Sequence, residues 1–435
     1  MINFMDEMKL LEKSGRGELT PENLKLVEED LKLLSRGVNE IISLEDLAVK
    51  LINSKKTGRK LKIKLGIDPT APHVHLGFAV VLRKLRQFQD LGHTVQLLIG
   101  DFTARIGDPT GRSETRKMLT PEEIAENART YRQQLSIILD SEKTNVRFNS
   151  EWLSPLTFEN LIEITSKFTV ARILERDDFN NRYEQGMPIG LHEFLYPIMQ
   201  GYDSVALESD VEMGGTDQKF NILVGRNLQK DYGIEPQVVF LMPILEGTDG
   251  VKKMSKSYGN YIGITEPAEE MFGKVMSIPD ELITRYFELC TDVPLEEIAG
   301  IKQDMDNQRV NPRDVKMKLA QEIIKIYHNE EAARRGKEHF LTVFSRKEIP
   351  DDIPSLKLVD KLDEDGKIFI DKLVTLTGFA GSKREARRLI EQGAVKIDGE
   401  KLPDSRMKLK VENGMVLQVG SRKFMELQAW GFNYK

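Results

Sequence analysis

Residues 61–100 contain the pattern that most narrowly limits the fold of this chain. Residues 61–67 alternate apolar and basic side chains, which is typical of a strand. Residues 78–88 are apolar at helical spacing, and Gly92 follows them as a stop signal for a helix. Residues 94–100 form a second strand-like run. A strand, a helix and a strand in succession predict an α/β domain with a doubly wound parallel sheet.

The turn between the first strand and the helix, residues 68–77, is rich in proline and places His75 at the helix start. Backbone N–H groups at a helix N-terminus favour an anion such as phosphate, and a neutral imidazole can donate a hydrogen bond to the same anion. A capped strand-to-helix turn with an incidental histidine explains this stretch as well. The turn alone therefore does not establish a phosphate site.

A second motif is the run Lys-Met-Ser-Lys-Ser at residues 253–257, which lies between two glycine-containing segments and looks mobile. Two ammonium groups that close over a triphosphate can neutralise the charge on a leaving pyrophosphate, as adenylyl transfer requires. A solvated basic loop also explains such a run when it stands alone. The interpretation depends on what accompanies it.

Together these motifs are specific. His75-Leu76-Gly77 followed by the run at 253–257 resembles the paired signatures of class I aminoacyl-tRNA synthetases. Residues 196–203 with residues 214–218 resemble the amino-acid pocket of tyrosyl-tRNA synthetases of bacterial type, and residues 106–113 fit the same family. The resemblance covers nearly the whole chain. It implies activation of L-tyrosine by ATP to tyrosyl-AMP and pyrophosphate, and then transfer of the tyrosyl group to the 3′ end of tRNA(Tyr).

The resemblance implies that Thr70 and His75 hold the triphosphate from the helix side, and that Lys253, Lys256 and Ser257 close on it from the loop side. Positioning and charge stabilisation are expected to supply most of the catalysis. The expected ATP-binding residues are Asp68, Gly77, Gly215, Asp217, Arg112 and Arg116. Surface solvation is an alternative explanation for the two arginines. Mg²⁺ is expected to accompany ATP, held mostly by phosphates and water, with no tightly bound cofactor.

The resemblance also implies which residues bind the amino acid: Asp108, Tyr196, Gln200, Asp203 and Gln218. Asp203 stands at the position that accepts from the phenol hydroxyl. Tyr196, Gln200 and Asp203 are spaced so that they share one face of a helix, which suits a single ligand. Gly214 and Gly215 are expected to leave room for the adenylate.

This sequence departs from the family pattern at three positions. Phe78 stands where most members have a second signature histidine, which removes one hydrogen bond to the nucleotide, worth about 1 kcal/mol. Val81 stands where some members have a polar ribose contact. Lys64 stands where some members have a tyrosine beside the phenol, so Asp203 is expected to be the main phenol partner.

Charge is distributed unevenly along the chain. Residues 366–435 carry 14 Lys and Arg against 8 Asp and Glu, a net of +6, whereas the whole chain carries −6, so residues 1–365 carry −12. A basic tail on an acidic body indicates a polyanionic partner. A predicted helix at 383–392, capped by Ser382, brings together Lys383, Arg384, Arg387 and Arg388. With the helix at 370–376 and the strand at 395–397, the tail resembles the small RNA-binding domain shared by a ribosomal protein, pseudouridine synthases and bacterial tyrosyl-tRNA synthetases; an ordinary amphipathic helix is the alternative.

The remaining composition sets limits on the class of protein. A length of 435 residues indicates about three domains. No apolar run approaches the length of a membrane span, the longest being a buried strand at 238–245, and the acidic first residues do not resemble a signal peptide. A single cysteine, Cys290, excludes an internal disulfide and fits a reducing, cytoplasmic setting, and with six histidines it argues against structural zinc.

The predicted organisation has five parts. They are a helical segment at 1–60, a Rossmann-like catalytic domain at 61–265 with a mostly helical connective insertion at about 120–192, a helical domain on the anticodon side at 266–345, a linker at 346–365 and the RNA-binding domain at 366–435. The insertion implies a homodimer by family resemblance.

Two rival functions come from other classes. One is a synthetase paralogue that activates an amino acid but charges something other than tRNA, which the intact basic tail argues against. The other is a non-catalytic RNA-binding protein on the same scaffold, for which Phe78 is the only support. Tyrosine-dependent pyrophosphate exchange, measured with and without tRNA charging, separates all three.

Overall fold

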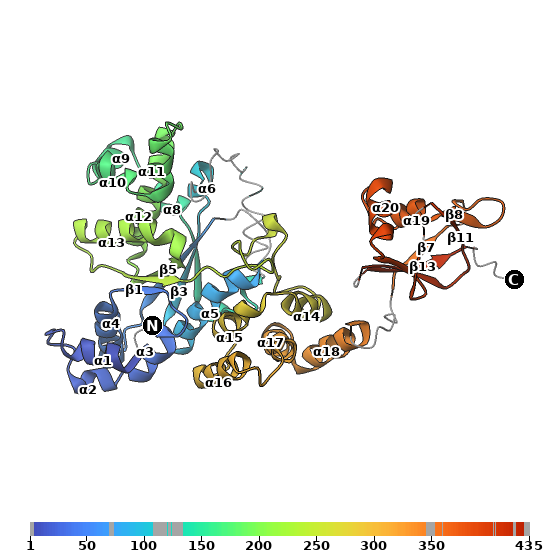
Figure 1. Cartoon of the computed structure of the whole chain (residues 1–435). Coiled ribbons are helices and arrows are strands. Elements are labelled where there is room, and N and C mark those ends of the chain that lie inside the picture. Colours follow the sequence, from blue (N-terminus) through green and yellow to red (C-terminus); the bar gives the residue numbers. More distant parts are fainter. Residues whose placement is uncertain are drawn as a thin grey trace. The chain divides into compact units, whose positions relative to one another are not determined.

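The computed structural model describes residues 4–68, 74–107, 120, 123, 134–344, 353–358, 360–402, 404, 406–420 and 423–429. The chain divides into two compact units, residues 1–333 and 334–435 (Figure 1). Each unit has its own sheet and its own core, so each is described by itself. Among the described residues, no helix has the length and apolar character needed to cross a membrane.

A six-stranded sheet forms the centre of the first unit, in the order β1-β6-β5-β2-β3-β4. Its strands are β1 (Glu40–Ile42), β2 (Lys62–Ile67), β3 (Thr94–Ile99), β4 (Thr144–Phe148), β5 (Val211–Gly215) and β6 (Val238–Met242). Neighbours pair in parallel except β1, which runs antiparallel to β6. The chain builds outward in one direction from β2 and in the other from β5. This reversal makes the carboxyl ends of β2 and β5 the switch point where such sheets bind ligands.

Helices surround this sheet. Before and between its strands lie α1 (Phe4–Glu12), α2 (Pro21–Lys25), α3 (Glu28–Ser35), α4 (Leu44–Thr57), α5 (Leu76–Asp90), α6 (Thr103–Ile106), α8 (Ser150–Leu153), α9 (Phe158–Thr165), α10 (Val170–Leu174), α11 (Asp177–Glu184), α12 (Leu195–Leu207) and α13 (Lys219–Asp231). After the sheet come α14 (Ala268–Met276), α15 (Ile283–Cys290), α16 (Leu295–Asp306) and α17 (Pro312–Tyr327). Helix α18 (Glu330–Phe344) begins in the first unit, but most of its residues belong to the second. The sequence-based prediction of a doubly wound α/β fold is confirmed.

Local signals explain where these elements begin and end. The side chain of Ser43 accepts a hydrogen bond from the Asp46 N–H at the start of α4, and Gly58 ends that helix in the left-handed region, with φ of 74°. Strand β6 is buried along its whole length, as expected of the apolar run at 238–245. Helices of the insertion share a core with α12 and α13 that includes Phe179, Ile198 and Leu228.

Two strands differ from the sequence-based expectation. Residues 1–60 were expected to be helical, but Glu40–Ile42 form edge strand β1, whose partner β6 lies some 200 residues further along the chain. The segment at 120–192, expected to be mostly helical, contributes β4 to the sheet edge beside β3. Both strands are short and edge-located, so neither carries the long apolar pattern that marks a central strand.

The second unit contains a five-stranded sheet in the order β10-β9-β12-β13-β7 and a two-stranded pair, β11-β8. Its elements are β7 (Ser355–Lys357), β8 (Lys367–Phe369), α19 (Ile370–Leu376), α20 (Lys383–Glu391), β9 (Val395–Ile397), β10 (Glu400–Lys401), β11 (Lys408–Lys410), β12 (Met415–Val419) and β13 (Lys423–Gln428). The expected helix at 370–376 and strand at 395–397 are confirmed, and α20 ends one residue earlier than expected.

The start of this second unit differs from the expected linker at 346–365. Strand β7 lies inside that range and pairs in parallel with β13, and Leu358 is fully buried in the core of the unit. Polar residues and prolines suggested a linker. A three-residue strand that is held in place by one buried leucine has no sequence pattern long enough to be recognised. The folded part of the tail therefore begins before residue 366.

Candidate functional site

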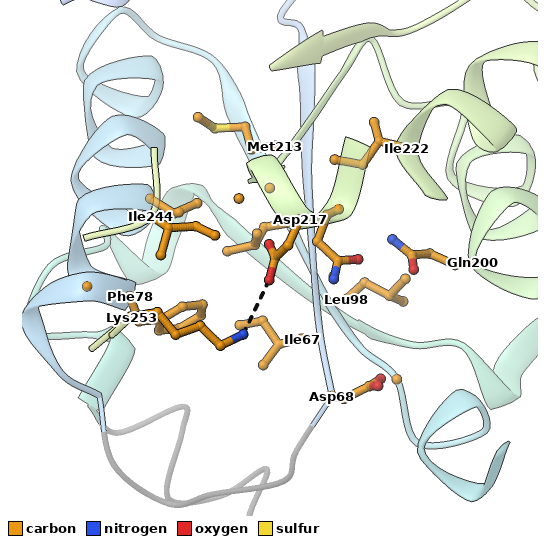
Figure 2. A pocket seen from close by; sticks show the side chains of 18 of the residues that line it. Ile67, Asp68, Phe78, Leu98, Gln200, Met213, Asp217, Ile222, Ile244 and Lys253 are labelled. Atoms are coloured by element: carbon orange, nitrogen blue, oxygen red, sulfur yellow. Dashed lines mark ion pairs between the residues drawn. The ribbon is translucent and has the colours of Figure 1, made fainter. Parts of the chain in front are cut away.

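A cavity of about 450 Å³ lies at the carboxyl ends of β2 and β5, at the switch point of the sheet (Figure 2). Every predicted catalytic or substrate-binding residue of the first unit that lies among the described residues lines it. These are Asp68, His75, Gly77, Tyr196, Gln200, Asp203, Gly215, Asp217, Gln218, Lys253, Lys256 and Ser257. Thr70, Asp108, Arg112 and Arg116 lie outside the described residues.

Asp203, on α12, occupies the buried end of this cavity, with 1% of its surface exposed. The indole Nε1 of Trp152 donates to its Oδ1 at 2.7 Å, and Asn149 Nδ2 donates to its Oδ2 at 3.3 Å. Burial raises the pKa of Asp203 to about 7, against the opposing effect of the Lys64 charge and these two donors. Sequence analysis missed Asn149 and Trp152, because they come from the insertion and belong to no motif.

Lys64, on β2, lies behind Asp203 and is fully buried. Lys64 Nζ lies 2.9 Å from Glu212 Oε1 on the neighbouring strand β5 and donates to Ser204 Oγ at 2.8 Å. The buried charge is thus paired across the sheet, as a low-dielectric setting requires.

Tyr196 and Asp68 connect the two groups of residues that were expected to bind tyrosine and ATP. The hydroxyl of Tyr196 donates to Asp68 Oδ2 at 2.8 Å, and Thr103 Oγ1 donates to Asp68 Oδ1 at 3.2 Å. Gln200, one turn after Tyr196 on α12, has a buried carboxamide oxygen that accepts no hydrogen bond from the described residues. That oxygen is a ready acceptor for a ligand ammonium group.

His75 is the N-cap of α5, and its Nδ1 accepts a hydrogen bond from the backbone N–H of Phe78 at 3.3 Å. Because Nδ1 is an acceptor, the proton of the neutral ring is on Nε2. Burial lowers the pKa of His75 to about 4, so the ring is neutral at physiological pH. The site therefore presents a neutral N–H donor at a helix N-terminus.

The signature loop has a fixed backbone and exposed cationic side chains. Asn260 is buried; its Oδ1 accepts from the Ser255 N–H at 2.8 Å and its Nδ2 donates to the Lys253 carbonyl at 3.2 Å. Met254 is also buried, and its sulfur accepts from the Gly77 N–H at 3.3 Å. The side chains of Lys253 and Lys256 are exposed. The loop backbone is thus held by Asn260, and the Met254 side chain ties the loop to the start of α5.

Lys253 reaches across the cavity mouth to Asp217, with Nζ 3.6 Å from Oδ2 (Figure 2). Both groups are partly exposed, so this ion pair contributes little to stability. A polyanionic ligand can therefore attract the ammonium group away from Asp217 at small cost.

Gly214 and Gly215, at the end of β5, border the cavity. A Cβ atom on Gly214 would lie 2.8 Å from Ile222 Cδ1, and one on Gly215 would lie 2.7 Å from Asp217 Oδ1. In both cases the added Cβ would meet the far end of a side chain, so that side chain would have to shift if the glycine were replaced.

The residue types in this region do not form a metal site of their own. Among the described residues, no group of three or more His, Cys, Asp or Glu is placed to hold a metal ion.

Helix α20 of the second unit carries the predicted RNA-binding residues. Ser382 caps it by accepting from the Glu385 N–H. Lys383, Arg384, Arg387 and Arg388 are all exposed on it. Arg387 also pairs with the buried Asp371 of α19 at 2.7 Å, which fixes the guanidinium and leaves the other three cations facing water.

Comparisons with known proteins agree with this geometry. Residues 55–345 match the family model for class I tRNA synthetases of the tryptophan and tyrosine type. The tyrosine–tRNA ligase of Moorella thermoacetica is 56% identical over 93% of this chain and 97% of its own length, and that of Thermotoga maritima is 56% identical over 92% and 97%. The chain belongs to the tyrosyl-tRNA synthetase family. Residues 370–414 of this synthetase match the S4 domain model.

Solved structures of synthetases share the fold at lower identity. A C-terminally truncated mitochondrial tyrosyl-tRNA synthetase of Aspergillus nidulans matches with a TM-score of 0.59 and 22% identity, over 78% of this synthetase and 100% of that chain. The tyrosyl-tRNA synthetase of Archaeoglobus fulgidus, solved with L-tyrosine, matches with a TM-score of 0.57 and 24% identity, over 72% and 99% of the two chains.

Proposed function

We propose that this synthetase is a tyrosine–tRNA ligase that works in two steps within the cavity at the switch point. In the first, a carboxylate oxygen of tyrosine attacks the α-phosphorus of ATP, and pyrophosphate leaves. In the second, a hydroxyl of the terminal ribose of tRNA(Tyr) attacks the tyrosyl carbonyl, and AMP leaves. The observation that carries this proposal is the single cavity that combines a buried phenol acceptor, Asp203, with the exposed lysines of the signature loop.

Asp203 accepts the hydrogen bond of the tyrosine phenol at the buried end. Trp152 and Asn149 already donate to this carboxylate, so it is fixed before the ligand arrives. Gln200, Tyr196 and Gln218 surround the ammonium and carboxylate of the amino acid, together with Asp108. The unpartnered oxygen of Gln200 supports this role, since it is a buried acceptor that lacks a donor among the described residues.

The triphosphate of ATP lies between the start of α5 and the signature loop. The neutral Nε2–H of His75 donates to a phosphate oxygen, with Thr70 and the backbone near Gly77 on the same side. Lys253, Lys256 and Ser257 act from the loop on the pyrophosphate as its charge grows, assisted by Arg112 and Arg116. Asp68, Gly215 and Asp217 bind the nucleotide from the ends of β2 and β5.

Mg²⁺ would accompany ATP, with phosphate oxygens and water as its main ligands. Its charge helps to neutralise the leaving pyrophosphate. The synthetase needs no tightly bound cofactor.

The second unit holds tRNA(Tyr) through its S4 domain. Lys383, Arg384 and Arg388 face solvent on α20, and such side chains bind backbone phosphates without reading bases. Arg387, fixed by Asp371, adds a fourth cation with a defined position.

The active form is a cytoplasmic homodimer joined through the connective insertion, and no membrane takes part. Large apolar side chains lie exposed on this insertion: Phe158, Ile162, Val170, Tyr183 and Leu191. Exposed apolar groups gathered in one segment favour burial against another protein surface. The family resemblance implies that this partner is a second copy of the chain.

Pyrophosphate exchange and tRNA charging test the proposal in one preparation. Exchange that depends on tyrosine, and charging of tRNA(Tyr) with tyrosine, are the expected results. Exchange without charging would favour the paralogue, and the absence of both would favour a non-catalytic RNA-binding protein.

A further inference from the structure

Lys64 makes a complete set of contacts from a fully buried position at the back of the tyrosine pocket. Its three N–H groups are directed to Glu212 Oε1 at 2.9 Å, Ser204 Oγ at 2.8 Å and the Gln200 carbonyl at 3.2 Å. An ammonium group has three donors, so none is left over. Lys64 is therefore held in one place, with its ammonium group against the Gln200–Ser204 stretch of α12.

The contacts of Lys64 bracket Asp203 on that helix. Gln200 lies three residues before Asp203, and Ser204 directly follows it. Strand β2 thus fixes the stretch of α12 that presents the carboxylate to the cavity. Asp203 and Glu212 both line the cavity, whereas Lys64 lies behind them.

Among the residues that the structure describes, the charges at this end of the cavity are the two carboxylates of Asp203 and Glu212 and the ammonium group of Lys64. Glu212, on β5, is 1% exposed, and its Oε2 accepts from Ser204 Oγ at 2.8 Å and from Gln237. The groups that face Asp203 are Lys64 from β2, Glu212 from β5, Trp152 from α8 and Asn149 just before it. Lys64 favours the ionised form of Asp203, and Glu212 opposes it.

We propose that Lys64 is a positioning residue for tyrosine recognition, whose ammonium group keeps the Asp203 carboxylate in place and in its charged form to accept the phenol hydroxyl. This inference rests on the proposed role of Asp203 as the phenol partner. Some members of the family have a tyrosine at the position of Lys64. In this chain the position instead carries a positive charge, which acts on the phenol through Asp203. The family resemblance alone gives no such role to a lysine.

The test is the affinity for tyrosine as a function of pH, measured by calorimetry without ATP from about pH 5.5 to pH 8.5. Omitting ATP removes the titration of its phosphates from the profile. Since the pKa of Asp203 is about 7, wild-type tyrosine affinity is expected to fall roughly tenfold between pH 8 and pH 6. Lys64→Met should move the midpoint to higher pH, and Glu212→Gln should move it to lower pH.

The double variant Lys64→Met with Glu212→Gln removes one charge of each sign and should return the midpoint close to that of the wild type. If Lys64→Met alone fails to fold, comparing the double variant with Glu212→Gln still isolates the effect of Lys64. Lys62→Met is the matched control, because Lys62 is on the same strand but is partly exposed and pairs with Glu208. Its midpoint should match that of the wild type.

Opposite shifts for the two single variants support the inference, because a merely structural lysine would weaken binding at every pH without moving the midpoint. Shifts in the same direction, or no shift, would overturn it. A wild-type protein that binds no tyrosine would instead contradict the proposed function itself. The two failures are therefore distinguishable in one set of titrations.

Discussion

The two ends of the cavity differ in how their charged side chains are held. At the α12 end, Asp203, Glu212 and Lys64 are buried, and each is hydrogen-bonded by groups from other elements. At the signature-loop end, Lys253 and Lys256 are exposed, and only the loop backbone is fixed, through Asn260 and Met254. The buried end is suited to selecting a small ligand by a fixed hydrogen-bond pattern. The exposed end is suited to charges that must follow a departing polyanion.

This difference teaches that selection and activation can be separated by mutation. A change at the buried end should alter which amino acid binds. A change at the loop end should alter how fast the adenylate forms. The predictions below run from the largest expected effect to the smallest.

Lys256→Ala should reduce the rate of tyrosyl-AMP formation about 100-fold to 1,000-fold, because it removes a cation that acts on the transition state. The dissociation constant for tyrosine should stay nearly unchanged. Single-turnover kinetics measures both. Lys252→Ala is the matched control, since Lys252 lies over the ring of Tyr258 and does not line the cavity. An unchanged first-step rate in Lys256→Ala would remove this lysine from the mechanism.

Asp203→Asn should lower the preference for tyrosine over phenylalanine by roughly tenfold to 100-fold, because the phenol loses a charged hydrogen-bond partner. The KM for ATP should change little. The ratio of kcat/KM values for the two amino acids is the measurement. Glu208→Gln, at the exposed end of the same helix, is the control. If the ratio holds steady in Asp203→Asn, the phenol is recognised by another group.

Removal of residues 353–435 should leave tyrosyl-AMP formation intact and reduce tRNA charging about tenfold at low salt. The benefit of the tail should shrink as salt rises, because it acts through phosphates. Pyrophosphate exchange and charging across a salt series measure these effects. Equal charging by the truncated and full-length forms at low salt would show that the tail does not hold tRNA.

A second truncation sharpens the position of the boundary. Removal of residues 366–435 leaves β7 and Leu358 without their partners in the second unit. This form should aggregate more readily than the one that ends at residue 352, because it exposes an unpaired strand and a core leucine. Light scattering at matched concentration compares them, and equal behaviour would argue against the boundary that β7 indicates.

His75 should show no protonation above about pH 5, because burial lowers its pKa to about 4 and protonation requires a pH below that range. The expected result is a flat ring chemical shift across neutral pH in an NMR titration with labelled histidine. His75→Gln identifies the signal. A midpoint near the ordinary histidine value would show that the ring is charged at the phosphate site.

Sequence motifs predicted the fold class and singled out residues that the structure brings together around one cavity, because both depend on strong local patterns. The strand–helix–strand at 61–100 and the runs at 196–203 and 253–257 lie at the switch point of the sheet, where the cavity is found. Strands β1, β4 and β7 were missed, as were β8 and β10 to β13 of the second unit. Pairing with a partner distant in the sequence, rather than its own pattern, defines each of β1, β4 and β7.

The network of buried polar residues around Asp203 could not be predicted from the sequence either. Lys64 and Glu212 are about 150 residues apart, and only the parallel pairing of β2 with β5 places them side by side. Asn149 and Trp152 reach Asp203 from the insertion, which has no recognisable site motif. The role of a buried polar residue depends on which charged groups lie next to it. Only the tertiary structure determines those neighbours.

A double-mutant cycle with Asp203→Asn and Lys256→Ala tests the separation of the two ends most directly. Tyrosine affinity and the single-turnover rate of adenylate formation are measured for the wild type, both single variants and the double variant. If the buried end selects and the loop end activates, the effects on the free energy of the transition state add to within about 0.5 kcal/mol. A coupling energy of about 1 kcal/mol or more would contradict this account, because it would mean that the phenol pocket and the loop lysines act as one unit.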